Sequence, residues 1–140
     1  MIAYGPVPSR RLGRSLGINS IPHKICTYSC AYCQVGRTLR FQVDPSSFYE
    51  PVLIAREVGL QVAKAREAGD TIDYLSFVPD GEPTLDTHLG ETIDRLKPAL
   101  FCAVPTLFSA LLEHPLVRRG KADFRSIRGC FSGASALMAE

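Results

Sequence analysis

Residues 47–78 read SFYEPVLIAREVGLQVAKAREAGDTIDYLSFV and carry the clearest structural signal in the chain. Ser47, with Glu50 three residues later, forms a capping box that predicts the start of a helix. Apolar residues then recur at steps of three and four as far as Ala65, which is the helical period. The run at residues 72–78 is almost wholly apolar and predicts a strand buried on both faces. A helix followed by a buried strand is the repeating unit of an α/β protein.

The same alternation continues on both sides of this stretch. We expect short strands at residues 16–19, 100–104 and 127–131, and further helices at residues 87–97 and 106–114. Strands and helices that alternate at this spacing predict a parallel sheet. A complete (βα) barrel needs about 200 residues or more. The predicted fold is therefore α/β, an incomplete parallel (βα) barrel with half the strands of a full one.

Composition and charge restrict the class of protein. The 140 residues are 46% hydrophobic and 21% charged, which is ordinary for a globular domain. No segment supplies the ~20 apolar residues of a membrane span, and residues 1–11 show no signal peptide, so we expect a cytoplasmic location. Net charge is +2, but residues 1–43 carry six basic residues and no acidic one. Such a segment suits an anionic cofactor or a phosphate-bearing substrate, or it is a solvated face balanced by the acidic remainder.

Three of the five cysteines lie close together, at Cys26, Cys30 and Cys33. They fall in a predicted loop over residues 22–45, and loops of that length inside a compact domain are usually functional. Three thiolates at this spacing can converge on one soft metal centre. Two kinds of metal site are consistent with this spacing. One is a zinc site with His23 as a fourth ligand, and the other is an iron–sulfur cluster in which one iron has no protein ligand. Buried thiols are the third interpretation, and it explains cysteines in a polar loop poorly.

The turn Gly81-Glu82-Pro83 follows the strand predicted at residues 72–78. In a parallel array this turn and the cysteine loop lie at the carboxyl ends of strands, where such folds place their sites. A second polar element on that face favours a cluster together with a bound small molecule over a structural zinc site.

Several motifs together resemble those of a known family. CTYSCAYC at residues 26–33 and FVPDGEPTL at residues 77–85 resemble the cysteine signature and the Gly-Glu turn of the radical S-adenosylmethionine enzymes. The opening YGPVPSRRLGRSLGIN and the run YCQVGRT are similar to a branch related to wyosine-type tRNA-modifying enzymes. The resemblance covers residues 3–97.

This resemblance implies a cofactor set and a reaction. The three clustered cysteines would ligate a [4Fe–4S] cluster whose open iron would bind S-adenosylmethionine. Tyr32 would lie near the adenine, and Gly81, Glu82 and Pro83 would border the methionine end. Reductive cleavage would give a 5′-deoxyadenosyl radical that the protein positions and shields. The implied partners are an external electron donor, such as flavodoxin or ferredoxin, and an RNA or small-molecule substrate.

Residues 100–140 are similar instead to a core segment of the AMP-forming acyl-CoA ligases, through VPTLFSALLEHP and FRSIRGCFSGASAL. The implied adenine turn is Gly133, Ala134, Ser135 and Ala136. Residues 1–98 are therefore interpreted as half of a radical enzyme and residues 99–140 as a ligase-like fragment, in a truncated or chimeric chain too short for a complete active site.

Two alternatives stay open: a non-catalytic zinc-binding module that contacts RNA, and a fragment of an acyl-CoA ligase. In the incomplete barrel, the strands at residues 100–104 and 127–131 would form the open sheet edge, so self-association is expected. Cys102 and Cys130 lie in apolar or small-residue surroundings and are expected to be ordinary buried thiols.

Overall fold

The computed structural model describes residues 1–9, 13–31, 33, 35–97, 100–103, 108, 109, 112, 113, 115–121, 123–127 and 129–132. Its strands are β1 (Ala3–Ser9), β2 (Gly13–Ile18), β3 (Ile25–Cys26), β4 (Arg40–Phe41), β5 (Tyr74–Phe77), β6 (Leu100–Ala103) and β7 (Gly129–Ser132). Its helices are α1 (Pro51–Glu67), the 3-10 turn η1 (Pro83–Leu85), α2 (Leu89–Leu96) and the single turn α4 (Pro115–Arg118). Within these described parts, no helix has the length and apolarity to cross a membrane.

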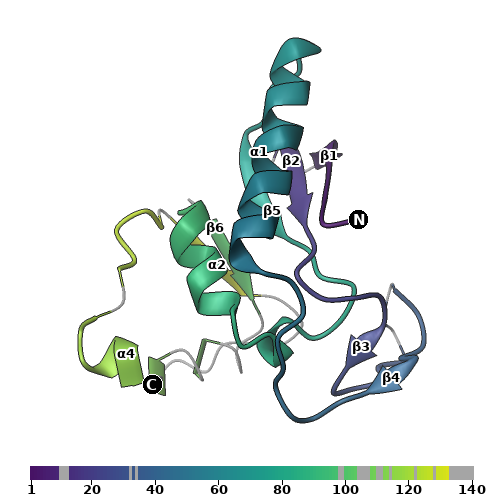
Figure 1. The fold of residues 1–140 in the computed structure, drawn as a ribbon, viewed down its shortest axis with the longest axis vertical. Coiled ribbons are helices and arrows are strands. Elements are labelled where there is room, and N and C mark those ends of the chain that lie inside the picture. The colour runs from purple at the N-terminus through teal and green to yellow at the C-terminus, as the bar shows by residue number, and fades with distance from the viewer. Residues whose placement is uncertain are drawn as a thin grey trace.

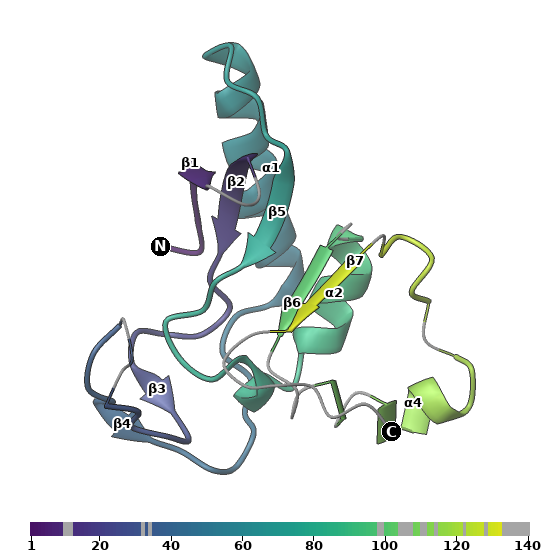
Figure 2. The same cartoon turned by 180° about the vertical axis from the view of Figure 1, so that it is seen from behind.

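The main sheet has the order β1-β2-β5 and is covered on one face by α1 (Figures 1 and 2). β1 runs antiparallel to β2, whereas β5 runs parallel to it. Ile54 and Val58 of α1 pack against Leu16 and Ile18 of β2, and all four side chains are buried. Burial of a side chain of this size is worth about 1.5–3 kcal/mol, so this contact fixes the helix on the sheet.

The prediction of an incomplete parallel (βα) barrel is wrong. The described strands form three separate sheets, one of three strands and two of two strands. The N-terminal segment, although rich in proline and glycine, forms β1 and adds an antiparallel edge to β2. β6 pairs with β7, and neither pairs with β5. No continuous parallel array of (βα) units therefore arises in the part of the chain that the structure describes.

Several element boundaries also differ from those predicted. The prediction of a capping box at Ser47 and Glu50 is wrong. Helix α1 begins at Pro51, and its N-cap residue Glu50 makes no side-chain capping bond. β5 is half-buried rather than buried on both faces, because α1 covers only one face of its sheet. The helix predicted at residues 106–114 falls mostly outside the described residues. The division of the chain after residue 98 and the expected self-association stay predictions.

A second, smaller core lies between β3 and η1. It consists of the buried Ile21, Ile25 and Leu85, with Phe48 packed against it. This core attaches the segment that carries the three clustered cysteines to the turn that follows β5.

The turn after β5 approaches β3 so closely that only glycine fits at residue 81. A Cβ on Gly81 would lie 1.9 Å from the carbonyl oxygen of Ile25, which is far inside van der Waals contact. On either side of Gly81, the Lys24 amide donates to the Asp80 carbonyl at 2.9 Å, and the Glu82 amide donates to the Ile25 carbonyl at 3.1 Å. The two segments are therefore joined backbone to backbone.

We predict that Gly81→Ala lowers the free energy of unfolding by about 1–3 kcal/mol, because the new methyl group must push the turn away from β3. The matched control is Gly59→Ala inside α1, where an added Cβ meets nothing within 4 Å. This control should raise the free energy of unfolding by about 1 kcal/mol through helix propensity. Urea unfolding followed by circular dichroism measures both. Equal stability of the two variants would contradict the close approach.

Asp86, directly after η1, is a buried carboxylate. It is only 4% exposed, and its Oδ1 accepts the backbone N–H of His88 at 3.0 Å. Its Oδ2 has no hydrogen-bond partner among the described residues. Burial raises the pKa of Asp86, and the hydrogen bond and charge of His88 offset this only in part.

Because the pKa of Asp86 is higher in the folded chain, folding favours its protonated form. We therefore predict that stability falls as the pH rises from the unfolded-state pKa of about 3.9 through the folded-state pKa. Asp86→Asn should remove this loss and flatten the dependence of the melting temperature on pH. The control Asp44→Asn changes an exposed aspartate and should leave the profile as in the parent. An Asp86→Asn profile parallel to that of the parent would disprove the effect of burial.

Candidate functional site

The three clustered cysteines lie at and just beyond the end of β3. Cys26 is the last residue of β3 and is half-buried, and its Sγ accepts the N–H of Tyr28 at 3.4 Å. Cys30 and Cys33 are exposed. The Cys33 amide donates to the Cys30 carbonyl at 3.1 Å, and the Gly36 amide donates to the Cys33 carbonyl at 2.9 Å. Two successive backbone hydrogen bonds therefore link Cys30, Cys33 and Gly36.

The Gly-Glu-Pro turn lies beside β3, so two motifs far apart in the sequence are neighbours. The Glu82 carboxylate, however, is turned to its own helix: its Oε1 accepts the Thr84 hydroxyl at 2.6 Å and the Thr84 N–H at 3.2 Å. Pro83 is the first residue of η1. Tyr32 lies outside the described residues. The cofactor roles of these four residues stay predictions.

The described residues do not fit the predicted metal centres. No group of three histidine, cysteine or acidic side chains among them is arranged to hold a metal ion. His23, which would have been the fourth zinc ligand, lies with its Nδ1 3.4 Å from Asp80 Oδ2. Cys26 is half-buried while Cys30 and Cys33 face solvent, so spacing in the sequence did not fix where the thiols lie. Neither the iron–sulfur cluster nor the zinc site has a ligand set in this part of the structure.

The same segment carries cations without acidic partners. Arg37 and Arg40 are exposed, and neither they nor Lys24 form an ion pair among the described residues. Six other cations in the described parts do pair with carboxylates: Arg14, Arg56, Arg95, Lys97, Arg118 and Arg125. Residues 1–43 contain no acidic side chain, so these three cations have no carboxylate near them in the sequence.

Lys24 is the structural centre of this segment. Its φ is 63°, in the left-handed region, and its carbonyl accepts the amides of Leu39 and Arg40, each at 3.1 Å. The residue is only 9% exposed, and its side chain reaches Gly36, where a Cβ would lie 2.9 Å from the Lys24 Nζ. A lysine ammonium therefore lies next to the turn that leads into Arg37.

Two aromatic rings are exposed beside these cations. Tyr28 is 64% exposed and Phe41 is 66% exposed. The Thr38 hydroxyl donates to the Tyr28 carbonyl, and the Gln42 amide donates to the Cys26 carbonyl at 3.3 Å, so both rings belong to one unit. We call Lys24, Tyr28, Arg37, Arg40 and Phe41 the β3–β4 surface. Sequence reasoning missed its two aromatic residues; their only signal was their place in a segment without acids.

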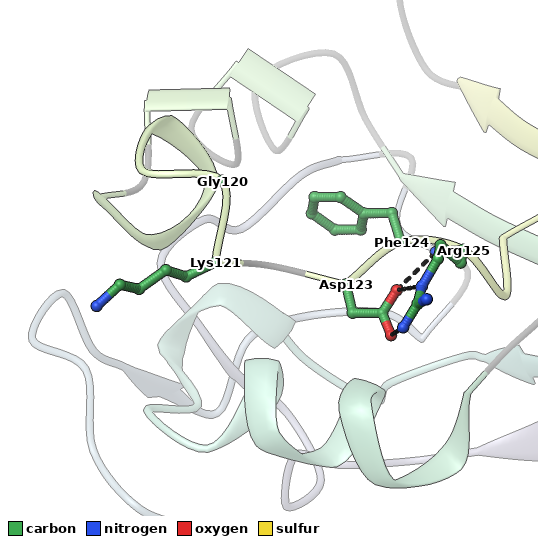
Figure 3. Close-up of a pocket in the computed structure, with 5 residues that line it drawn as sticks. All are labelled: Gly120, Lys121, Asp123, Phe124 and Arg125. Carbon is green, nitrogen blue, oxygen red and sulfur yellow. Dashed lines mark hydrogen bonds and ion pairs between the residues drawn. The ribbon is translucent and has the colours of Figure 1, made fainter.

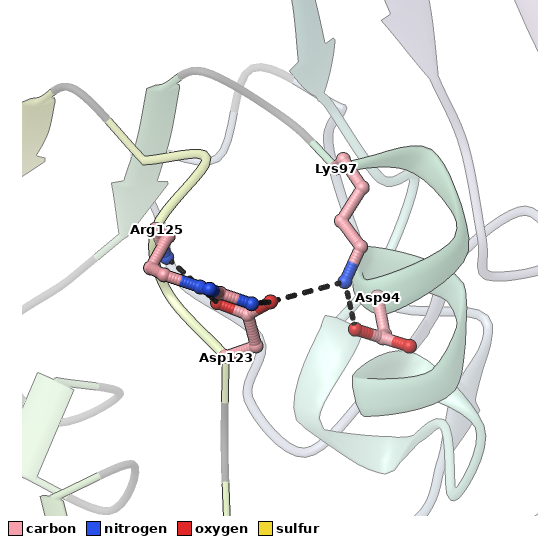
Figure 4. Close-up of polar contacts among 4 residues, drawn as sticks. All are labelled: Asp94, Lys97, Asp123 and Arg125. Atoms are coloured by element: carbon pink, nitrogen blue, oxygen red, sulfur yellow. Dashed lines mark hydrogen bonds and ion pairs between the residues drawn. The ribbon is translucent and has the colours of Figure 1, made fainter.

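A hollow lies towards the other end of the chain, lined by Gly120, Lys121, Asp123, Phe124 and Arg125 (Figure 3). Two of its charged groups, Asp123 and Arg125, are already paired with each other. Asp123 accepts two hydrogen bonds from the Arg125 guanidinium, at 2.9 and 3.0 Å, and these bonds hold the pKa of Asp123 well below its usual range. Lys97 lies 3.8 Å from Asp123 and also pairs with Asp94 (Figure 4). This hollow therefore offers a ligand fewer free charges than the β3–β4 surface.

Comparison with known proteins gives relatives but no activity. No family model and no solved structure matches the chain. A UPF0026 protein of Methanocaldococcus jannaschii is 53% identical over 96 residues, which are 69% of this chain and 29% of that protein. A UPF0026 protein of Helicobacter pylori is 34% identical over 131 residues, or 91% of this chain and 41% of that protein. The chain thus spans less than half the length of these curated relatives.

These relatives overturn the resemblance to the radical S-adenosylmethionine enzymes. They are UPF0026 proteins, a different family, and nothing in their names supports a [4Fe–4S] cluster, S-adenosylmethionine or radical chemistry. The electron-donor partner depended on the cluster and is not carried further. A long-chain-fatty-acid–CoA ligase of Bacillus subtilis is 44% identical over 48 residues, but these are only 8% of that ligase and bring no ligase activity with them. The chain is therefore similar to UPF0026 proteins, whose name states no activity.

Proposed function

We propose that the β3–β4 surface binds a single-stranded nucleic acid, with RNA as the form to test. The observation that carries this proposal is the placement of unpaired cations beside two exposed aromatic rings, on a segment without acidic residues. Surfaces that bind single strands combine cations that follow the phosphate backbone with rings on which bases stack. The β3–β4 surface has both features, and the proposal requires no metal or cofactor.

The geometry of β4 supports contact with base and phosphate together. Arg40 and Phe41 are neighbours on a short strand, so their side chains point to opposite faces of the sheet. Within the described residues β4 pairs only with β3, so its other edge is open. A nucleotide lying across this edge would meet the Phe41 ring on one side and the Arg40 guanidinium on the other. Arg37, which is also exposed, would extend the positive track.

The position of the β3–β4 surface in the molecule also suits the binding of a nucleic acid. β3 and β4 lie at one end of the molecule, away from the C-terminal half of α1 (Figure 1). The Lys24–Asp80 and Glu82–Ile25 backbone bonds attach the unit to the main sheet. The rings and guanidinium groups are thereby presented to solvent on a supported frame rather than on a free loop.

We predict that the double variant Arg37→Ala/Arg40→Ala weakens RNA binding and lowers its dependence on salt. Each phosphate contact on a single strand contributes about 0.7 to the slope of log K against log salt, so the slope should fall by about 1.4. The measurement is fluorescence anisotropy of a labelled oligoribonucleotide at several salt concentrations. The control is Lys64→Ala/Arg66→Ala, which removes two exposed cations from α1. If the two double variants gave equal salt slopes, the RNA would be attracted only to the net charge of the protein and not to the β3–β4 surface.

Removal of the Phe41 ring gives an independent test. Loss of one stacked base costs about 1–3 kcal/mol, so Phe41→Ala should weaken RNA binding about 5- to 150-fold and leave the salt slope unchanged. Leu60→Ala, which removes a side chain 57% exposed on α1, is the matched control and should bind as the parent does. Tight binding by Phe41→Ala would show that stacking on β4 plays no part.

A further inference from the structure

A chain of polar contacts joins Asn19, Asp80 and His23 where β2 and β5 end. The Asn19 Nδ2 donates to Asp80 Oδ2 at 3.0 Å, and the Asn19 Oδ1 accepts the Asp80 amide at 3.0 Å. The His23 Nδ1 lies 3.4 Å from the same carboxylate oxygen of Asp80. Asn19 is buried, so the Asp80 carboxylate has a fixed partner on one side and the imidazole on the other. The carboxyl ends of parallel strands, where these residues lie, are the usual place for sites in α/β sheets.

The contact with Asp80 orients the imidazole of His23. A carboxylate beside Nδ1 accepts the hydrogen of that nitrogen, which leaves the lone pair on Nε2 at the other side of the ring. The His23 side chain is 62% exposed, so a ligand from solution can reach it. A base that a third group holds in place is the arrangement by which enzymes present a histidine for proton transfer. His23 is therefore suited to accept a proton at Nε2.

This imidazole lies beside the cations of the β3–β4 surface. His23 directly precedes Lys24, and the Lys24 carbonyl accepts the Arg40 amide at 3.1 Å. Consecutive Cα atoms are about 3.8 Å apart, so a phosphate bound at Arg40 would bring its ribose near His23. Arg37 and Arg40 are exposed and form no ion pair among the described residues. A guanidinium group also stabilises the negative charge that develops on a phosphoryl group during its transfer.

We propose that His23 is the general base of an RNA-cleaving site and that Asp80 is its positioning residue. This inference rests on the RNA binding proposed for the β3–β4 surface. The His23 Nε2 takes the proton of a ribose 2′-hydroxyl, and the 2′-oxygen attacks the adjacent phosphorus. The bond from phosphorus to the 5′-oxygen of the next nucleotide breaks, and this oxygen takes a proton from water. The imidazolium then returns its proton to the hydroxide. The products are a 2′,3′-cyclic phosphate and a 5′-hydroxyl, and the reaction consumes no co-reactant.

The test uses the full chain and a labelled single-stranded oligoribonucleotide, in buffer with EDTA to suppress metal-dependent nucleases. Denaturing electrophoresis measures the cleavage rate, and mass spectrometry identifies the new ends. The parent chain should give fragments that end in a 2′,3′-cyclic phosphate. The oligodeoxyribonucleotide of the same sequence has no 2′-hydroxyl and should stay intact.

Two histidine variants, purified in parallel, separate the proposed base from a contaminating nuclease. His23→Gln should lower the cleavage rate about 100- to 10,000-fold, which is the usual contribution of general acid–base catalysis. Its affinity for the oligoribonucleotide, measured by fluorescence anisotropy, should stay as in the parent. His88→Gln is the matched control, because His88 lies at the start of α2 and its Nδ1 is 3.4 Å from Ser47 Oγ. This control should cleave as the parent does.

Asp80→Asn tests the positioning role. The amide keeps the shape of the side chain but loses the charge that holds the Nδ1 hydrogen, so kcat should fall while KM stays unchanged. Circular dichroism confirms that each variant is folded. A parent chain that binds the oligoribonucleotide but leaves it intact would overturn the cleavage site and leave the proposed binding in place, as would equal cleavage by the parent and His23→Gln. A parent chain that does not bind RNA would overturn both.

Discussion

The close approach of Gly81 to the carbonyl of Ile25 is the constraint on which the β3–β4 end of this protein depends. Residues 22–44 leave the main sheet after β2 and have little core of their own. They are attached to the body by the backbone bonds around Gly81, and Asn19 holds the neighbouring Asp80. The Asn19 Nδ2 donates to Asp80 Oδ2 at 3.0 Å, and its Oδ1 accepts the Asp80 amide at 3.0 Å. Asn19 is only 5% exposed, so water does not compete strongly for these bonds.

The unpaired cations of the β3–β4 surface cost the fold little stability and suit the binding of an anionic ligand. An exposed ion pair contributes about 0–1 kcal/mol to folding, so leaving Arg37 and Arg40 without carboxylates costs the fold little. The absence of acids in residues 1–43 removes local competitors for an anionic ligand. Lys24 differs from these two arginines. Its left-handed backbone conformation sets the course of the loop, so the fold of the segment depends on this residue.

The sequence predicts some elements well and others poorly, for physical reasons. The body of α1 and the strand β5 can be predicted because the pattern of apolar residues lies within each segment itself. β1 does not, because Pro6 and Pro8 favour a loop, and proline is tolerated in an edge strand once a partner is present. The cysteine spacing suggested a metal centre, but spacing does not set side-chain direction or exposure. Exposure of Phe41 and Tyr28 is likewise a property of the tertiary structure and not of the local sequence.

The short ladder between β3 and β4 determines more than its length suggests. Leu39, Phe41 and Val43 alternate with Arg40 and Gln42, and Gln42 is held by bonds of 2.8 Å to the Asp44 carbonyl and to Ser46 Oγ. A slip of one residue along β3 would exchange the two faces of the strand. The same five side chains would then present a guanidinium where a ring now lies. What the surface can recognise is thus encoded in an alignment of strands, in which the backbone amide of Gln42 donates to the Cys26 carbonyl at 3.3 Å.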